Sequence, residues 1–286
     1  MLNTDKEFEE LRAALKNFGV HKGDILYTTS DITRLMFHAH NQHQIETSSE
    51  YNEYMSKLID LLKNVVGSEG TLLFPVFTWN FCRGNGFSIK TTKGETGSLH
   101  NWILKNRSDF RRTQHPIYSF MVWGKDSDLL VGMENQDAWG EDSPFAYFRK
   151  NNAKMFMIDV VPGKCSTFMH YVEDYLKVPW RYMKDFVGDY TDADGNITRR
   201  KYSMFVRDLD IDSTLVTDPA VFDGKNVLHK ALWAEVDLYF MEFEKAFPFY
   251  ADDLKNNNAK SCYHFENYTP DWSRGQTHPD LKLSLD

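Results

Sequence analysis

The sequence predicts an α/β fold in which most core strands of the central sheet run parallel. Short apolar runs of strand length alternate with segments whose apolar residues recur at helical spacing. Strands that alternate with helices are typical of parallel βαβ units. After Pro179 the pattern changes to alternating residues around an Asp-Gly turn, which predicts a hairpin. We therefore expect one α/β core with a C-terminal embellishment of hairpin and helices.

The core elements follow one another in a regular order. Phe8, Leu11, Leu15 and Phe18 recur at helical spacing, and Gly19 follows as the expected C-terminal cap. Further helices are expected over 51–65, 99–104 and 142–148, and strands over 23–31, 71–79, 118–124 and 154–161.

Residues 187–208 have the alternation of a hairpin, with its turn at Asp194 and Gly195. The turn resembles the middle of an EF-hand calcium loop. However, Tyr190 occupies the first ligand position, and Lys201 stands where a bidentate glutamate belongs. A hairpin turn is the better interpretation.

The rest of the C-terminal part is predicted more coarsely. Residues 228–246 are expected to be helical, and the polar tail from Asn256 lacks clear periodicity. We divide the chain into an acyltransferase core, 1–182, and a C-terminal segment, 183–286, whose hairpin and helices complete the same fold.

Composition excludes several classes of protein. A net charge of −8 disfavours a nucleic-acid binder, which needs a basic face. Cys82, Cys165 and Cys262 are far apart and odd in number, so no disulfide framework is indicated. The N-terminal segment is an acidic amphipathic helix and not a signal peptide, and no apolar run is long enough to span a membrane. We expect a cytoplasmic, reduced protein.

Three local patterns are candidates for a functional site. No glycine-rich nucleotide loop has the required spacing. His38, His40 and His43 could hold a transition metal, but a solvated or substrate-side loop that acts as a lid is the preferred interpretation, and no metal is predicted. Cys82 has no local base to activate it, so an inert buried thiol is expected.

The segment 166–174 carries the strongest catalytic pattern. If Thr167 caps a helix, His170 lies in the first turn and Glu173 lies on the same face. The positive end of a helix keeps an imidazole neutral and able to accept a proton, while a nearby carboxylate fixes its tautomer. His170 and Glu173 are thus a candidate base and its orienting group. A surface ion pair is the alternative that spacing alone leaves open.

Six motifs, in this order, resemble the aminoglycoside 3-N-acetyltransferase-like (antibiotic N-acetyltransferase) family. Each motif alone is weak, but their order is specific, and the match extends over about residues 19–182. The motifs are GVHKGDILYTTSDITRL, GSEGTLLFPVFTW, TTKGETGSLHNWI, RRTQHPIYSFMVWG, WGEDSPFAYF and STFMHYVEDYLKVPWR.

The resemblance implies an α/β/α sandwich and an acyl-CoA-dependent N-acyltransferase. The coenzyme A thioester is then a co-substrate, with no cofactor bound permanently, and His170 with Glu173 becomes the leading catalytic pair. Direct attack by an amine needs a proton acceptor and oxyanion donors, but no covalent intermediate on the enzyme.

Two departures from the family pattern point to the acceptor. Residues 29–32 read Thr-Ser-Asp-Ile where antibiotic-modifying members have His-Ser-Ser-Leu, and residues 91–93 read Thr-Thr-Lys in place of Thr-Pro-Ser. The chain resembles the branch that N-acylates nucleotide-linked amino sugars with acetyl or 3-hydroxybutyryl-type groups. A dTDP-linked amino-dideoxyhexose for surface polysaccharide, such as lipopolysaccharide, is the first choice of acceptor.

Cofactor-binding positions are assigned to turns that lead into helices, where backbone N–H groups can bind the pantetheine or pyrophosphate. These are Thr29 and Ser30 in one turn and Gly140 and Ser143 in another. Arg112 is a candidate phosphate partner because its fork suits planar anions, with an ordinary surface charge as the alternative.

Substrate-binding positions are assigned to Asp31 of the altered loop and to Thr78 and Trp79, which close the second strand. Trp79 could stack on a sugar or a base, or simply belong to the core. His115 resembles the family's His-Pro and either lines the site or supports a turn.

Three rival functions remain open. The first is a true aminoglycoside 3-N-acetyltransferase. The second is thioester hydrolysis, with His170 activating water, and the third is a non-catalytic module that binds a nucleotide sugar. A homo-oligomer is compatible with all of them.

Overall fold

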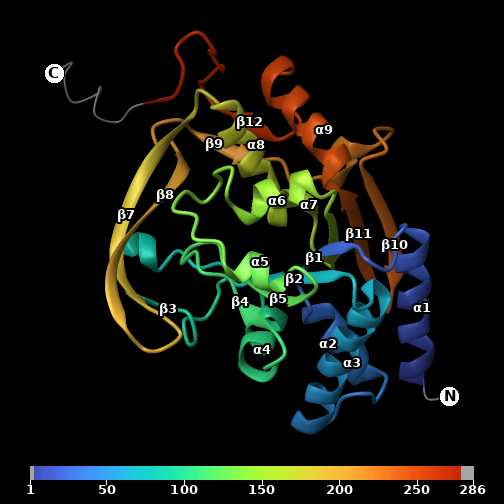
Figure 1. Ribbon diagram of the computed structural model, residues 1–286. Coiled ribbons are helices and arrows are strands. Elements are labelled where there is room, and N and C mark those ends of the chain that lie inside the picture. The colour runs from blue at the N-terminus through green and yellow to red at the C-terminus, as the bar shows by residue number, and fades with distance from the viewer. Residues whose placement is uncertain (1–2, 278–286) are drawn as a thin grey trace.

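The computed structural model describes residues 3–277 and is built around a seven-stranded mixed sheet (Figure 1). Its centre is parallel: β1 pairs in parallel with β2 on one side and with β6 on the other. Antiparallel pairs flank this centre, so that only β11 and β5 run against the common direction. In spatial order the strands are β10 (Leu228–Trp233), β11 (Val236–Glu242), β6 (Lys154–Ile158), β1 (Ile25–Ser30), β2 (Thr71–Pro75), β5 (Phe120–Gly124) and β4 (Arg111–Arg112).

The central strands are apolar on both faces because each face is covered. In β1 the side chains of Ile25 and Tyr27 belong to one hydrophobic core, and that of Leu26 belongs to the other. In β6 the same alternation separates Met155 from Phe156. Strands of a sheet buried on both sides are expected to read as continuous apolar runs, which is why they stand out in the sequence.

Helices pack on both faces of the sheet and form the two outer layers, which confirms the predicted α/β/α sandwich. One core is shared with α1 (Asn3–Asn17), α2 (Thr33–Asn41), α3 (Ser48–Val66) and α4 (Ser98–Asn106). The other core is shared with α5 (Ser127–Val131), α6 (Pro144–Lys150), α8 (Phe168–Leu176) and α9 (Phe243–Asn256).

The prediction of a helix over 228–246 is wrong for most of its length. This segment forms the β10–β11 hairpin, and α9 begins only at Phe243. Ala234 and Glu235 adopt positive φ angles of 46° and 59°, as in the two-residue turns that suit hairpins. Because β11 pairs with β6 inside the sheet and its two faces belong to the two hydrophobic cores, its apolar residues do not alternate, and their spacing imitates a helix.

The predicted C-terminal hairpin is confirmed and forms a long curved ribbon at one side of the molecule (Figure 1). Its two strands are β7 (Arg181–Thr191) and β8 (Ile197–Arg207). Smaller elements complete the fold, and they are β3 (Phe87–Ser88), β9 (Ser213–Leu215), β12 (Tyr263–Phe265), α7 (Pro162–Cys165), and the short 3-10 helices η1 (Phe81–Arg83) and η2 (Pro219–Phe222).

The segment with three histidines is not the loop that was predicted. His38 and His40 lie in α2, and His43 follows it. His38 is buried and hydrogen-bonds Glu7, 3.1 Å away, so α2 packs on the core and is not placed as a lid. Among residues 3–277 no cluster of three or more potential metal ligands occurs.

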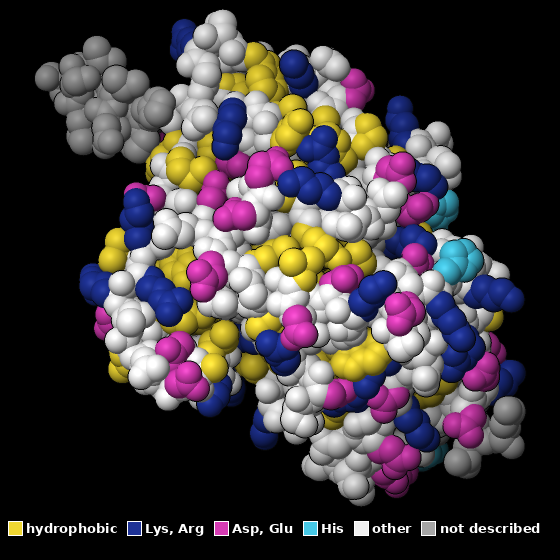
Figure 2. Space-filling view, in the orientation of Figure 1, with side chains coloured by type: hydrophobic (Ala, Val, Ile, Leu, Met, Phe, Trp, Pro, Cys, Tyr) yellow, Lys and Arg dark blue, Asp and Glu magenta, His cyan; other side chains and the backbone are white. Residues whose placement is uncertain are grey.

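Acidic and basic side chains are interspersed on the face that Figure 2 shows. In the part of the chain that the structure describes, no helix combines the length and apolar character needed to cross a membrane.

Gly124, at the end of β5, provides a test of the sheet packing. Its φ is +113°, and an added Cβ would overlap the carbonyl oxygen of Gly70. We expect Gly124→Ala to lower the free energy of unfolding by about 3 kcal/mol. The alanine would be held at a positive φ, and its methyl group would overlap the neighbouring backbone. Gly195→Ala is the matched control, because Gly195 has φ +90° but open space around it, and it should cost about 1 kcal/mol. Equal decreases in the free energy of unfolding for the two variants, measured by urea denaturation, would contradict the packing argument.

Candidate active site

Several residues singled out from the sequence line one cavity of about 330 Å³ beyond the carboxyl ends of β1 and β2. Open α/β sheets collect ligands at this edge. We call it the strand-end cavity, and its walls include Thr29, Ser30, Trp79, Glu95, Lys164 and His170.

His170 and Glu173 form the predicted pair on α8. Nδ1 of His170 lies 2.6 Å from Oε2 of Glu173. An ionised carboxylate can only accept, so the shorter contact, to Glu173, assigns the proton to Nδ1 and the lone pair to Nε2. Nη2 of Arg181, which can only donate, lies 3.0 Å from the same Nδ1 and contributes a positive charge beside the ring. Nε2 has no hydrogen-bond partner among residues 3–277, and the His170 side chain is 23% exposed. His170 lines the strand-end cavity, and its Nε2 is not engaged by the described part of the chain.

The helix begins as predicted, but not by the predicted cap. Thr167 precedes the first helical residue, yet its hydroxyl contacts the carbonyl oxygen of Cys165, 3.4 Å away, and makes no capping bond. His170 still lies in the first turn of α8.

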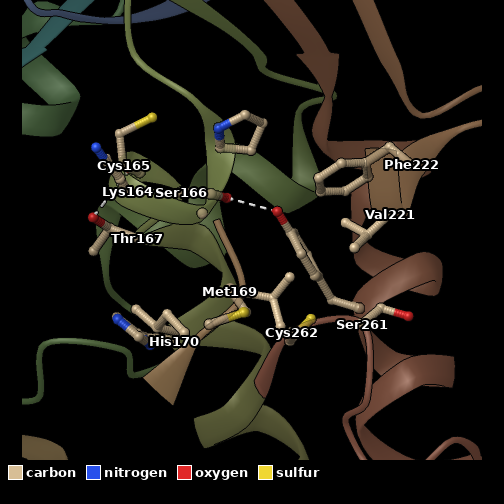
Figure 3. Close-up of a pocket in the computed structure, with 15 residues that line it drawn as sticks. Lys164, Cys165, Ser166, Thr167, Met169, His170, Val221, Phe222, Ser261 and Cys262 are labelled. Carbon is tan, nitrogen blue, oxygen red and sulfur yellow. Dashed lines mark hydrogen bonds between the residues drawn. The ribbon is translucent and has the colours of Figure 1, made fainter. Parts of the chain in front are cut away.

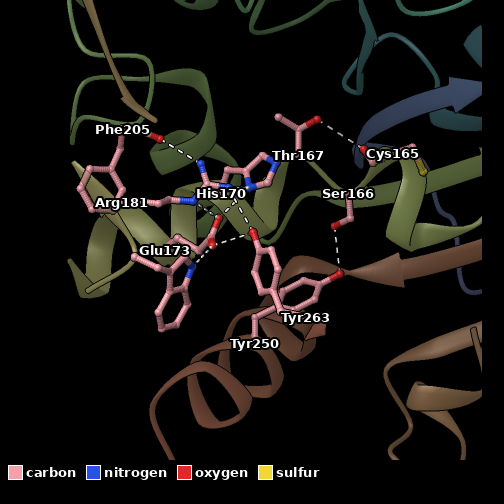
Figure 4. A network of polar contacts seen from close by, with 10 residues as sticks. Cys165, Ser166, Thr167, His170, Glu173, Arg181, Phe205, Tyr250 and Tyr263 are labelled. Carbon is pink, nitrogen blue, oxygen red and sulfur yellow. Dashed lines mark hydrogen bonds and ion pairs between the residues drawn. The ribbon is translucent and has the colours of Figure 1, made fainter. Parts of the chain in front are cut away.

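The Glu173 carboxylate is fully buried and surrounded by donors (Figure 4). Oε1 accepts hydrogen bonds from Nε1 of Trp180, at 3.0 Å, and from the hydroxyl of Tyr263, at 2.8 Å. Nε of Arg181 lies 2.9 Å from Oε2. The guanidinium also donates to the Tyr263 hydroxyl, at 3.1 Å, and to the carbonyl oxygen of Phe205, at 3.0 Å. The buried charge is thus both paired and hydrogen-bonded.

This arrangement sets the protonation states of the pair. Burial alone would raise the pKa of Glu173, but Arg181, together with the His170 and Tyr263 hydrogen bonds, lowers it to about 2. Burial, followed by the positive charge of Arg181, lowers the pKa of His170 below its ordinary value and outweighs the opposite effect of Glu173. With its pKa below the ordinary value, His170 is mostly neutral at pH 7.

The structure brings four of the other predicted residues to the cavity or its edge. Thr29, Ser30 and Trp79 line it, and the buried hydroxyl of Thr78 donates to Oε1 of Glu95 at 3.1 Å. The Ser30 hydroxyl lies 3.3 Å from Nε2 of His100, which is a buried histidine.

Arg112 and His115 do not line this cavity. The buried guanidinium of Arg112 donates to Ser119 and to backbone carbonyls that include Thr92, at 2.6 Å, and Val76, at 3.1 Å. It joins the loop after β3 to the end of β2. His115 accepts N–H bonds within its own turn, and burial lowers its pKa to about 3.

Gly140, Ser143 and Asp31 also lie outside the cavity walls. The buried hydroxyl of Ser143 caps α6 by accepting the N–H of Ala146 at 3.2 Å, and the Gly140 carbonyl accepts the N–H of Ser143. Asp31 is exposed and accepts the N–H of Thr33 at the start of α2.

Four site residues were missed from the sequence. Arg181 and Glu95 stand inside motifs that carry the family resemblance, so the motif positions could have suggested them. Tyr263 is 90 residues from Glu173, and no local pattern predicts their contact. Lys164, in α7, is a basic wall residue without a sequence signature.

A family model described as aminoglycoside 3-N-acetyltransferase matches residues 44–255, more than half of the chain. The chain belongs to this family. Membership confirms the predicted enzyme class, an acyl-CoA-dependent N-acyltransferase with the coenzyme A thioester as co-substrate. Comparison of the sequence with curated proteins gives no significant match.

Solved structures agree with the fold. Sisomicin-bound AAC-VIa gives a TM-score of 0.68 at 17% identity and covers 87% of this chain and 98% of its own. AAC-IIIb in a binary complex with CoASH gives a TM-score of 0.68 at 15% identity and covers 92% of this chain and 98% of its own. The YokD protein from Bacillus subtilis gives a TM-score of 0.65 at 16% identity and covers 87% of this chain and 99% of its own. Likeness at such low identity establishes the shared architecture.

The protonation state of His170 can be measured by NMR titration, with His170→Asn to assign the signal. We expect a midpoint below 6.5, because burial and Arg181 both oppose the imidazolium. Glu173→Gln should lower the midpoint further, since it removes the carboxylate that favours the charged form. A midpoint above 6.5 in the unmodified protein would contradict this electrostatic account.

Proposed function

We propose that the protein transfers an acyl group of the acetyl or 3-hydroxybutyryl type from coenzyme A to the amine of a nucleotide-linked amino sugar. A dTDP-linked amino-dideoxyhexose is the proposed acceptor, for surface polysaccharide synthesis. The observation that carries this proposal is the mostly neutral His170, which lines a cavity large enough for a small ligand group and whose Nε2 is not engaged by the described part of the chain. The cytoplasm is the proposed compartment, because all three cysteines are free thiols.

The proposed reaction is a direct transfer. The amine nitrogen attacks the thioester carbonyl carbon while Nε2 of His170 accepts the proton that the amine loses. The tetrahedral intermediate then collapses, the C–S bond breaks, and the thiolate of coenzyme A leaves and takes up a proton. Glu173 stabilises the transient imidazolium through the bond to Nδ1, so the catalytic roles belong to His170 and, by orientation, to Glu173.

The charge of the strand-end cavity supports an acceptor that is not a polycation. Among its described wall residues Glu95 is the one carboxylate, and Arg83 already neutralises it from 3.2 Å. Lys164 adds a positive charge to the same wall. A cavity that must hold several ammonium groups should carry a surplus of acidic residues, whereas a phosphate-bearing ligand is compatible with Lys164. The rings of Trp79 and Tyr118 offer apolar faces for a sugar or base.

Aminoglycoside acetylation is the second candidate. It is favoured by the family description and by the structural likeness to AAC-VIa, which was solved with sisomicin. An aminoglycoside also presents an amine to the same base, so His170 would have the same role in both reactions.

Replacing His170 tests the base. We expect His170→Asn and His170→Ala to lower kcat by about 100-fold or more, as is typical when a general base is removed. Binding of coenzyme A, measured by calorimetry, should stay within about twofold of the unmodified protein. His43→Asn is a matched control, since His43 is exposed and pairs with Glu46 away from the site. Near-normal turnover by both His170 variants would refute the assignment.

The acceptor is identified by following thiol release. Acetyl-CoA and 3-hydroxybutyryl-CoA are each offered with dTDP-linked 3-amino and 4-amino dideoxyhexoses, and with an aminoglycoside in parallel. We expect release that depends on one sugar nucleotide. Release only with the aminoglycoside would establish the second candidate, and rapid release without any amine would indicate thioester hydrolysis.

A further inference from the structure

A groove of about 540 Å³ lies along the edge strand β4, and the proposed reaction gives it no role. It shares no wall residue with the strand-end cavity, nor with the smaller hollow of about 70 Å³ that adjoins that cavity at Lys164 and His170 (Figure 3). We call it the basic groove, because its walls carry five cationic side chains and no carboxylate. The five are Lys90, Lys105, Arg107, Arg111 and Arg112.

Two of the five cations are already paired with carboxylates. Nη2 of Arg107 lies 2.8 Å from Asp60 and 2.8 Å from Asp109, and Arg111 forms an ion pair with Asp128. None of these carboxylates belongs to the groove walls. The positive charge that a ligand would meet therefore comes from the other three side chains.

Lys90, Lys105 and Arg112 have no carboxylate partner in the described part of the chain. The two lysines are exposed. Arg112 is buried, and burial lowers its pKa to about 10, so the guanidinium is still charged at pH 7. Four of its five N–H groups donate to neutral oxygens, which are those of Ser119, Ile89, Thr92 and Val76. A buried cation without a counter-ion is costly, and an anion in the groove would reduce that cost.

The basic groove also has an apolar wall, formed by the half-buried side chains of Ile89, Leu104 and Val131. We infer that the groove binds a nucleotide, with its phosphate groups beside Lys90 and Lys105 and its base against this apolar wall. Phosphate groups bind lysine through its positive charge, and a flat base needs an apolar surface to cover its faces. The net charge of the chain is −8, so general basicity does not explain the groove.

Arg112 places the basic groove directly behind a wall of the strand-end cavity. Its Nη2 donates to the carbonyl oxygen of Val76 at 3.1 Å, and the neighbours Pro75 and Phe77 both line that cavity. The segment 89–96 likewise begins in the groove wall and ends in the cavity wall. The inference does not depend on the proposed function, although that function supplies two sources of the ligand, since coenzyme A and the proposed acceptor each carry a nucleotide.

The ligand class is tested by calorimetry with adenosine 3′,5′-bisphosphate, dTDP and pyrophosphate. We expect one of the nucleotides to bind at least about tenfold more tightly than pyrophosphate, because its base covers the apolar wall. The affinity should fall between about 50 mM and about 500 mM salt, since the lysines are exposed. Preference for the bisphosphate would identify the nucleotide end of coenzyme A, and preference for dTDP that of the acceptor. Absence of nucleotide binding, or equally tight binding of pyrophosphate, would overturn the inference.

Charge reversal locates the bound nucleotide. Lys105→Glu, in the last turn of α4, replaces an attraction by a repulsion and should weaken binding by about tenfold. Lys90→Glu, on a different segment, should have the same effect, so that damage to one element cannot account for both. Lys16→Glu is the matched control and should stay within about twofold. Lys16 is also exposed, lies in the last turn of α1 and has no ion-pair partner among residues 3–277.

Lys164→Glu tests the competing location, because Lys164 lines the strand-end cavity. Weaker nucleotide binding in Lys164→Glu, with none in Lys105→Glu or Lys90→Glu, would place the nucleotide in the strand-end cavity and refute the groove. His170→Asn should bind the nucleotide as tightly as the unmodified protein. Nucleotide binding that depends on Lys105 while no amine is acylated would support the groove and contradict the proposed function. Acylation without such binding would do the reverse.

Discussion

The buried carboxylate of Glu173 is the group on which the site depends. It has no exposed surface, and it is held by Arg181, Trp180 and Tyr263 as well as by His170. Loss of one partner from a buried ion pair typically costs about 3–5 kcal/mol, because the remaining charge is left uncompensated. One carboxylate thus fixes the relative positions of α8, the start of β7 and the C-terminal strand β12. The same contacts that stabilise this part of the fold orient the base.

Arg181 has a consequence for the chemistry as well as for stability. After burial, Arg181 is the second cause that lowers the pKa of His170, and it opposes the imidazolium that an ionised Glu173 beside the ring favours. Because the guanidinium balances the charge of the carboxylate, Glu173 can accept the hydrogen bond from Nδ1 while Nε2 stays unprotonated. The same arrangement therefore orients His170, the proposed base, and keeps its Nε2 unprotonated.

The sequence was sufficient for the parts of the site that depend on local spacing. His170 and Glu173 are one helical turn apart, and Thr29 and Ser30 directly end a buried strand, so their placement follows from periodicity. The contact of Tyr263 with Glu173 depends on how the tail returns to α8, and no local pattern encodes it.

The same limit explains the errors in the fold. The β10–β11 hairpin reads as a helix because its inner strand is covered on both faces, which removes the alternation that identifies a strand. The position of Arg112 shows the same limit, because besides the Ser119 hydroxyl its guanidinium donates to backbone carbonyls, which a sequence does not display. A sequence gives the type of each side chain, but it does not show which backbone groups that side chain contacts in the fold.

The two cavities draw their walls from different parts of the chain. The strand-end cavity is built from residues 27–170, whereas a second, smaller cavity that shares part of its wall uses 162–170 and then segments around 215–222 and 250–262. Gly163 shows how closely these segments approach, because a Cβ there would overlap the carbonyl oxygen of Val216. Substitutions in the C-terminal segments can therefore change one cavity while the other, and the base between them, stay intact.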